Sequence, residues 1–156
     1  MAIHIRNQQR SKSLNLRRVR KDLVKALALI GRKDDDLSLL FVGSRRMKYL
    51  NTRYRGIPRE TDVLSFPMET EGTTPWTTAL GPQMGRSSLL GDIVISVPRT
   101  IDQARDFGTS FHEELLRLLI HGLLHLIGYE HERDRRRRLR MEKKEKELLH
   151  ALEKMD

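Results

Sequence analysis

The segment from residue 110 to residue 128 constrains the fold of this chain more than any other part of the sequence. Apolar residues lie around most of the circumference of a helix drawn through it, and a helix that is apolar on all sides has to be buried. Ser110 followed by Glu113 predicts the N-terminus of this helix as a capping box, and Gly128 predicts its end. We therefore expect a central helix on which the rest of the chain packs.

Three histidines occupy eleven residues at the end of this predicted helix. His121 and His125 are four residues apart, so they lie on the same helix face, one turn from each other. His131 follows Gly128, after which the chain can turn back toward the same point. A single buried histidine is more often a hydrogen-bonded core residue, but this pair with a third close by predicts a metal site. Three imidazoles with one open position are typical of catalytic zinc, although several divalent metals accept the same ligands.

Gly122 limits the chemistry that such a metal site can support. An open-sided zinc activates water and polarises a substrate oxygen, and both peptide and phosphodiester hydrolysis use this chemistry. Zinc proteases carry a glutamate, the general base, directly after the first histidine, whereas this chain has Gly122. A glycine cannot transfer a proton, which argues against an ordinary metalloprotease, and it allows something to approach the helix closely. The sequence does not identify another general base.

The remaining pattern predicts alternating strands and helices. Strands are expected at residues 3–6, 37–42, 61–66 and 89–97, and helices at 16–30, 45–54, 98–107 and from 132 onward, with Ser44 as the N-cap of the second helix. Residues 68–88 are rich in Thr, Gly and Pro and are expected to form a long loop. Together they predict an α+β fold, a small four-stranded mixed sheet packed on helices, in a single domain over residues 1–156.

The net charge of +9 is distributed unevenly. Residues 1–33 hold ten basic residues against one acid, and a second basic cluster, Arg133–Arg140, begins two residues after His131. Such ends suggest a polyanionic partner such as RNA or DNA, although a solubilising surface explains the same charge. The chain has no cysteine, no apolar signal region at residues 1–6 and no run as long as a membrane span. We therefore expect a cytoplasmic protein without disulfides.

Three blocks of the sequence resemble the YbeY family of bacterial RNA-maturation endoribonucleases. The first is HGLLHLIGYEH at residues 121–131. The second is LNTRYRG at residues 50–56 followed by TDVLSFP at 61–67, and the third is LGDIVIS at residues 90–96. Together the blocks span about residues 45–131. Glu130 stands where the family usually has Asp, which keeps the charge but can shift a contact around the ligands.

The resemblance implies a zinc-dependent, single-strand-specific endoribonuclease that matures ribosomal RNA, notably at the small-subunit 3′ end, and serves ribosome quality control. It implies a zincin-like layout in which His121, His125 and His131 bind Zn²⁺, and association with a small-subunit ribosomal protein and an assembly GTPase. Arg55 matches an arginine that the family needs for activity. Its guanidinium is suited to bind a phosphate and stabilise its charge, the alternative being an ion pair with Asp62 or Asp92.

Two other functions stay open at this point. A metal-dependent hydrolase of peptides would use the same ligands, although Gly122 argues against it. A non-catalytic RNA-binding ribosome assembly factor would hold a structural metal and would need a fourth protein ligand, for which Glu130 is the nearest candidate. Cleavage of unstructured protein would favour the first alternative, and a closed metal site would favour the second.

Overall fold

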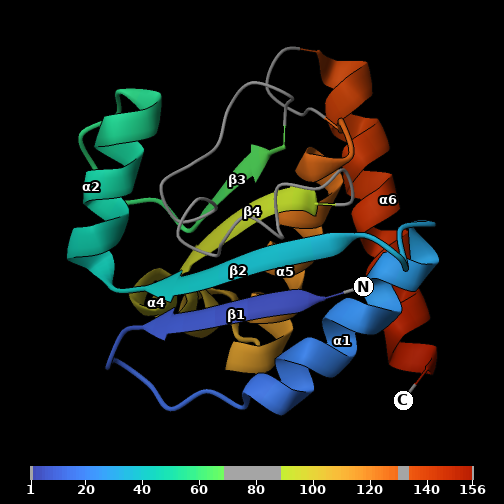
Figure 1. Cartoon of the computed structure of the whole chain (residues 1–156), viewed down its shortest axis with the longest axis horizontal. Helices are drawn as coiled ribbons and strands as arrows, with labels where there is room; N and C mark the ends of the chain where they lie inside the picture. The colour runs from blue at the N-terminus through green and yellow to red at the C-terminus, as the bar shows by residue number, and fades with distance from the viewer. Residues whose placement is uncertain (1, 69–88, 130–133, 156) are drawn as a thin grey trace.

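A computed structural model describes residues 2–68, 89–129 and 134–155 (Figure 1). Within these ranges four strands form one sheet in the order β1-β2-β4-β3. The strands β1 (Ile3–Gln8), β2 (Asp36–Val42) and β4 (Leu89–Ser96) run parallel to one another. The edge strand β3 (Val63–Pro67) pairs antiparallel with β4. The predicted four-stranded mixed sheet is therefore confirmed.

Five helices pack around the sheet in the described part of the chain. They are α1 (Leu16–Leu29), α2 (Ser44–Arg55), α4 (Val97–Phe107), α5 (Phe111–Leu126) and α6 (Arg135–Lys154). The sheet separates α1, α5 and α6 on one side from α2 on the other, and α4 follows β4 directly (Figure 1). The fold is α+β, as predicted. None of the described helices is long and apolar enough to cross a membrane.

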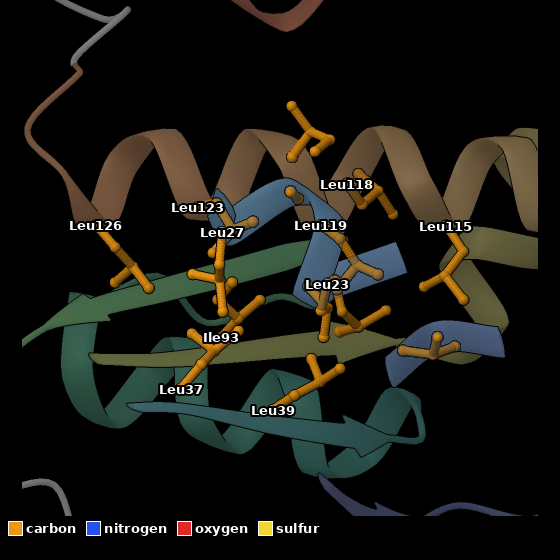
Figure 2. Packing of buried hydrophobic residues seen from close by; sticks show 14 of the residues in the cluster. Leu23, Leu27, Leu37, Leu39, Ile93, Leu115, Leu118, Leu119, Leu123 and Leu126 are labelled. Atoms are coloured by element: carbon orange, nitrogen blue, oxygen red, sulfur yellow. The ribbon is translucent and has the colours of Figure 1, made fainter. Parts of the chain in front are cut away.

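The helix α5 lies in the main hydrophobic core, as its all-round apolar pattern predicted. Figure 2 shows its leucines directed toward Leu23 and Leu27 of α1 and toward Leu37, Leu39 and Ile93 of the sheet. Most α5 residues from position 114 onward are buried. Each fully buried leucine of this kind contributes about 1.5–3 kcal/mol to the free energy of unfolding, so α5 is held firmly in place.

A smaller core on the opposite face of the sheet positions α2. Successive residues of a strand point to opposite faces, so Leu39 and Phe41 face α5 while Leu40 and Val42 face α2. Met47 and Leu50 are the buried residues of α2 that complete this cluster. The central strands β2 and β4 are covered on both faces, which is why they read as continuous apolar runs.

The helix and strand ends agree with the sequence in most places but not in all. Ser110 is the N-cap of α5, and its Oγ accepts a hydrogen bond from the backbone N–H of Glu113, as predicted. The prediction of Ser44 as an N-cap is wrong: α2 starts directly after β2, so Gly43 takes the cap position and Ser44 is the first helical residue. The third strand begins at Val63 rather than at residue 61. Residues 69–88 of the predicted loop lie outside the described residues.

Candidate active site

A cavity of about 930 Å³ lies where α2, β3 and α5 meet. Its walls are the end of α2, the segment 57–62 that leads into β3, one face of α5 and the residues that follow α5. Its polar lining includes Arg55, Asp62, Ser65, Arg117, His121 and His125. The fold therefore brings the predicted histidine pair and the predicted arginine into one cavity, although they come from helices on opposite sides of the sheet.

The Nε2 atoms of the two histidines of α5 lie close to each other. The distance between His121 Nε2 and His125 Nε2 is 3.1 Å, and the two rings cross at 76°. Two nitrogen ligands at about 2.0–2.1 Å from one tetrahedral zinc ion would lie about 3.3 Å apart. The spacing of the two imidazoles therefore fits two ligands of one Zn²⁺ ion.

Glu145 of α6 contacts His121 on the Nδ1 side of its ring, and no motif in the sequence distinguishes this glutamate. His121 Nδ1 lies 2.5 Å from Glu145 Oε1, and both side chains are less than one-fifth exposed. A carboxylate that accepts the Nδ1 proton fixes the ring orientation and leaves the Nε2 lone pair for a metal. This arrangement is the usual support of a metal-binding histidine, and it strengthens the match between the residues and zinc.

The third predicted ligand lies outside the described residues. His131 and Glu130 both belong to the segment 130–133, so neither is placed in the structure. Among the residues that are placed, no group of three His, Asp or Glu side chains is arranged to hold a metal. A catalytic zinc site requires three protein ligands, and His121 and His125, with Glu145 behind His121, are the two predicted ligands that the structure describes.

Arg55, the last residue of α2, has an exposed side chain at the cavity rim. Its NH2 group donates a hydrogen bond to the backbone carbonyl of Ser65 at 3.4 Å. The alternative to a phosphate-binding role was an ion pair of Arg55 with Asp62 or Asp92. Among the described residues, Arg55 forms neither ion pair. Asp62 instead accepts a 2.7 Å hydrogen bond from the backbone N–H of Val63 at the start of β3.

Gly122 faces the sheet rather than the cavity. Ser65 Oγ donates a hydrogen bond of 3.2 Å to the carbonyl of Gly122. A Cβ atom at this position would lie 3.1 Å from the Cγ2 atom of Ile93 and 3.1 Å from Ser65 Oγ. Gly122 was predicted to let another group approach the helix closely, and the structure shows that β3 and β4 are the elements that approach α5 there. It is this close contact that brings β3, one wall of the cavity, next to the histidines.

Arg117 is a second guanidinium in the cavity that we did not select from the sequence. It donates two hydrogen bonds of 2.7 Å to the buried carboxylate of Glu114, which also accepts one from Gln103. The hydrogen bonds to Glu114 raise the pKa of Arg117 above its ordinary value, so its positive charge is secure. Arg117 forms an ion pair with Glu114, which balances much of its charge. Arg55 has no carboxylate partner among the described residues.

His112 and the basic cluster at the start of α6 lie at structural or peripheral positions. His112 pairs with the buried carboxylate of Asp22 at 2.7 Å, which joins α5 to α1. In the basic cluster, Arg137 and Arg140 line a small hollow together with Gly128 and Tyr129, next to the end of α5. Arg133 lies outside the described residues.

The fold and the site define a class of protein: a small α+β domain whose buried central helix presents a His-x-x-x-His pair to a cavity rimmed by arginine. The model of one family, described as Endoribonuclease YbeY, matches residues 4–153. The chain belongs to this family.

Relatives of the chain extend over most of its length. A protein of Syntrophus aciditrophicus named Endoribonuclease YbeY is 39% identical over 153 residues, which cover 97% of this chain and 90% of that protein. A Bacillus cytotoxicus protein of the same name is 41% identical over 134 residues, 85% of this chain and 83% of that protein. A solution structure of a Thermotoga maritima protein matches with a TM-score of 0.62 and 28% identity, and covers 96% of this chain and 88% of that one.

Proposed function

We propose that this protein is a zinc-dependent endoribonuclease that cleaves single-stranded RNA in the cavity between α2, β3 and α5. The observation that supports it most is the convergence of the Nε2 atoms of His121 and His125, with Glu145 behind the first ring and Arg55 at the rim of the same cavity. The name of the family adds the reaction, because its members are called endoribonucleases.

Each residue of the site has a defined task under this proposal. His121, His125 and His131 would hold the ion, and Glu145 would keep the ring of His121 in the ligating orientation. When bound, zinc activates water and polarises a phosphoryl oxygen. Arg55 would bind a phosphate through two of its N–H groups and stabilise the negative charge that grows on the phosphate oxygens during cleavage.

The surroundings of the histidines favour RNA over peptide as the substrate. Peptide hydrolysis by zinc proteases uses a glutamate directly after the first histidine. In this chain that position is Gly122, which packs against the sheet. The positively charged guanidiniums of Arg55 and Arg117 line the cavity and suit a phosphodiester. The net charge of +9 would draw a polyanion toward it.

We further propose the cellular role that the sequence resemblance implies. The substrate would be ribosomal RNA, with the 3′ end of the small-subunit RNA as the main processing site and a part in ribosome quality control. The partners would be the ribosomal small subunit, one of its proteins and an assembly GTPase. The support for this role is family membership.

The decisive experiment compares the wild type with His125→Ala and with the control His150→Ala, which removes an exposed histidine of α6. Bound zinc is measured by elemental analysis, and cleavage of single-stranded RNA is measured with and without a chelator. We expect zinc and cleavage to be lost in His125→Ala and retained in His150→Ala. Arg55→Ala should keep zinc but slow cleavage by about 10²–10³-fold, since one charge-stabilising group is removed. RNA cleavage that survives both His125→Ala and the chelator would refute the proposal.

A further inference from the structure

The exposed surface of α2 carries a strong positive charge that the catalytic cavity does not account for. Residues 44–59 include six basic residues and no acid. Arg45, Arg46, Lys48 and Arg53 are exposed, and none of them forms an ion pair with another described residue. These cations repel one another in the free protein, so the patch attracts a negatively charged partner.

An exposed aromatic ring lies in the middle of these charges. Tyr49 is 54% exposed, and the guanidinium carbon of Arg46 lies 5.5 Å from the centre of its ring. Arg45, Tyr49 and Arg53 recur at intervals of four, so they form one line along the outer face of α2. The inner face is fixed by the buried residues Met47 and Leu50. A line of cations with an open aromatic ring is the surface on which single-stranded nucleic acids bind and stack.

This surface connects a second hollow with the catalytic cavity. A hollow of about 930 Å³ at the start of α2 is lined by Gln8, Gln9, Arg10, Tyr49 and residues 43–46. The helix then runs away from this hollow, alongside the sheet, and ends at Arg55 in the wall of the catalytic cavity (Figure 1). With 12 residues at about 1.5 Å each, α2 is about 18 Å long.

We propose that the outer face of α2, from the hollow at Arg10 to Arg53, is an RNA-binding track that guides a single strand into the catalytic cavity. The proposal deepens the proposed function and rests on it for the direction of the strand. The track holds roughly five nucleotides at about 3.4 Å per stacked nucleotide. Tyr49 stacks on a base while the arginines contact phosphates, which favours single-stranded RNA over an acidic protein or a duplex.

The test uses full-length protein with chelator, so that binding is measured without cleavage. The variants are Arg45→Glu/Arg46→Glu and Tyr49→Ala. The matched control is Arg17→Glu/Arg18→Glu, an exposed arginine pair at the equivalent positions in the first turn of α1 with the same change of net charge. The probes are fluorescent 15-nucleotide single-stranded and duplex RNA, titrated by anisotropy at several salt concentrations, with a glutamate 15-mer as competitor. Thermal melts verify that each variant is folded.

We expect Tyr49→Ala to weaken single-strand binding by about five- to a hundredfold and to leave duplex binding unchanged, because only an open base can stack. The Arg45→Glu/Arg46→Glu variant should weaken single-strand binding more than the α1 control does and reduce the slope of log K against log salt by about one to two. Equal losses in the α1 control, an unchanged affinity of Tyr49→Ala, or equally tight binding of the glutamate peptide would each overturn the track.

The cleavage assay separates failure of the track from failure of the proposed function. If wild-type protein binds the 15-mer through α2 but does not cut RNA when zinc is present, the nuclease is refuted and the RNA-binding surface stands. If it cuts RNA with zinc but the α2 variants bind and cut like the wild type, the nuclease stands and the track is refuted.

Discussion

At the scale of single residues, the support of His121 depends on one carboxylate. Because Glu145 holds the Nδ1 side of the ring, we predict that Glu145→Ala weakens zinc binding by about 10–100-fold, while Glu145→Gln, which keeps an acceptor oxygen, loses less. A competition titration against a chelator measures the affinity, and ¹⁵N NMR of the His121 ring reports the tautomer. Glu147→Gln is the control, since Glu147 lies on the same helix, is half exposed and, among the described residues, forms an ion pair with Lys144 alone, at 3.9 Å. Unchanged affinity in Glu145→Ala would contradict the role.

The site residues that could be predicted from the sequence are placed by local helix geometry, whereas the others are placed by tertiary packing. His121 and His125 could be paired because a helix fixes which residues share a face four positions apart. Glu145 is 24 residues further on, and nothing distinguishes it from the other acids of a highly charged helix until α6 is packed against α5. Arg117 was hidden for a related reason, because its place at the cavity depends on how α5 is rotated against β3.

At the scale of elements, the pairing of β3 with β4 depends on Gly91. Its φ is +150°, and a Cβ atom there would lie 2.4 Å from the backbone carbonyl oxygen of Phe66 and 2.8 Å from Leu126. We predict that Gly91→Ala lowers the free energy of unfolding by about 2–4 kcal/mol through strain and overpacking. Gly108→Ala is the control, because Gly108 also has a positive φ but an added Cβ would have none of the neighbouring described residues within 4 Å. This substitution should cost only about 1 kcal/mol. Urea unfolding measures both, and equal losses would exclude the close contact as the cause.

Most elements could be predicted because their apolar periodicity is strong, but their arrangement could not. The sequence predicted β2 and β4 as apolar runs of strand length, yet nothing local states that β4 lies between β2 and β3. The wrong N-cap at Ser44 has a similar origin. Serine is the better cap on average, but β2 continues to Val42 and the chain has only Gly43 in which to turn.

At the scale of the whole molecule, α6 joins the core through a few residues of an otherwise exposed helix. Met141, Leu148 and Leu152 are at most 3% exposed and belong to the core that surrounds α5. We predict that Leu148→Ala lowers the free energy of unfolding by about 2–5 kcal/mol, whereas Leu139→Ala, at a site that is 50% exposed, changes it little. Urea unfolding is followed by circular dichroism and by an independent probe on the sheet. Coincident transitions are expected for a single domain, and a separate early transition of α6 would contradict this.

The packing of α6 on α5 also sets an order of events while the protein is being made. The histidine pair leaves the ribosome first, and Glu145 follows 24 residues after His121. A growing chain that has completed α5 still lacks the carboxylate that orients His121 and the apolar residues that α6 adds to the core. Under the proposed function, a chain that ends before α6 would therefore hold zinc more weakly than the finished protein.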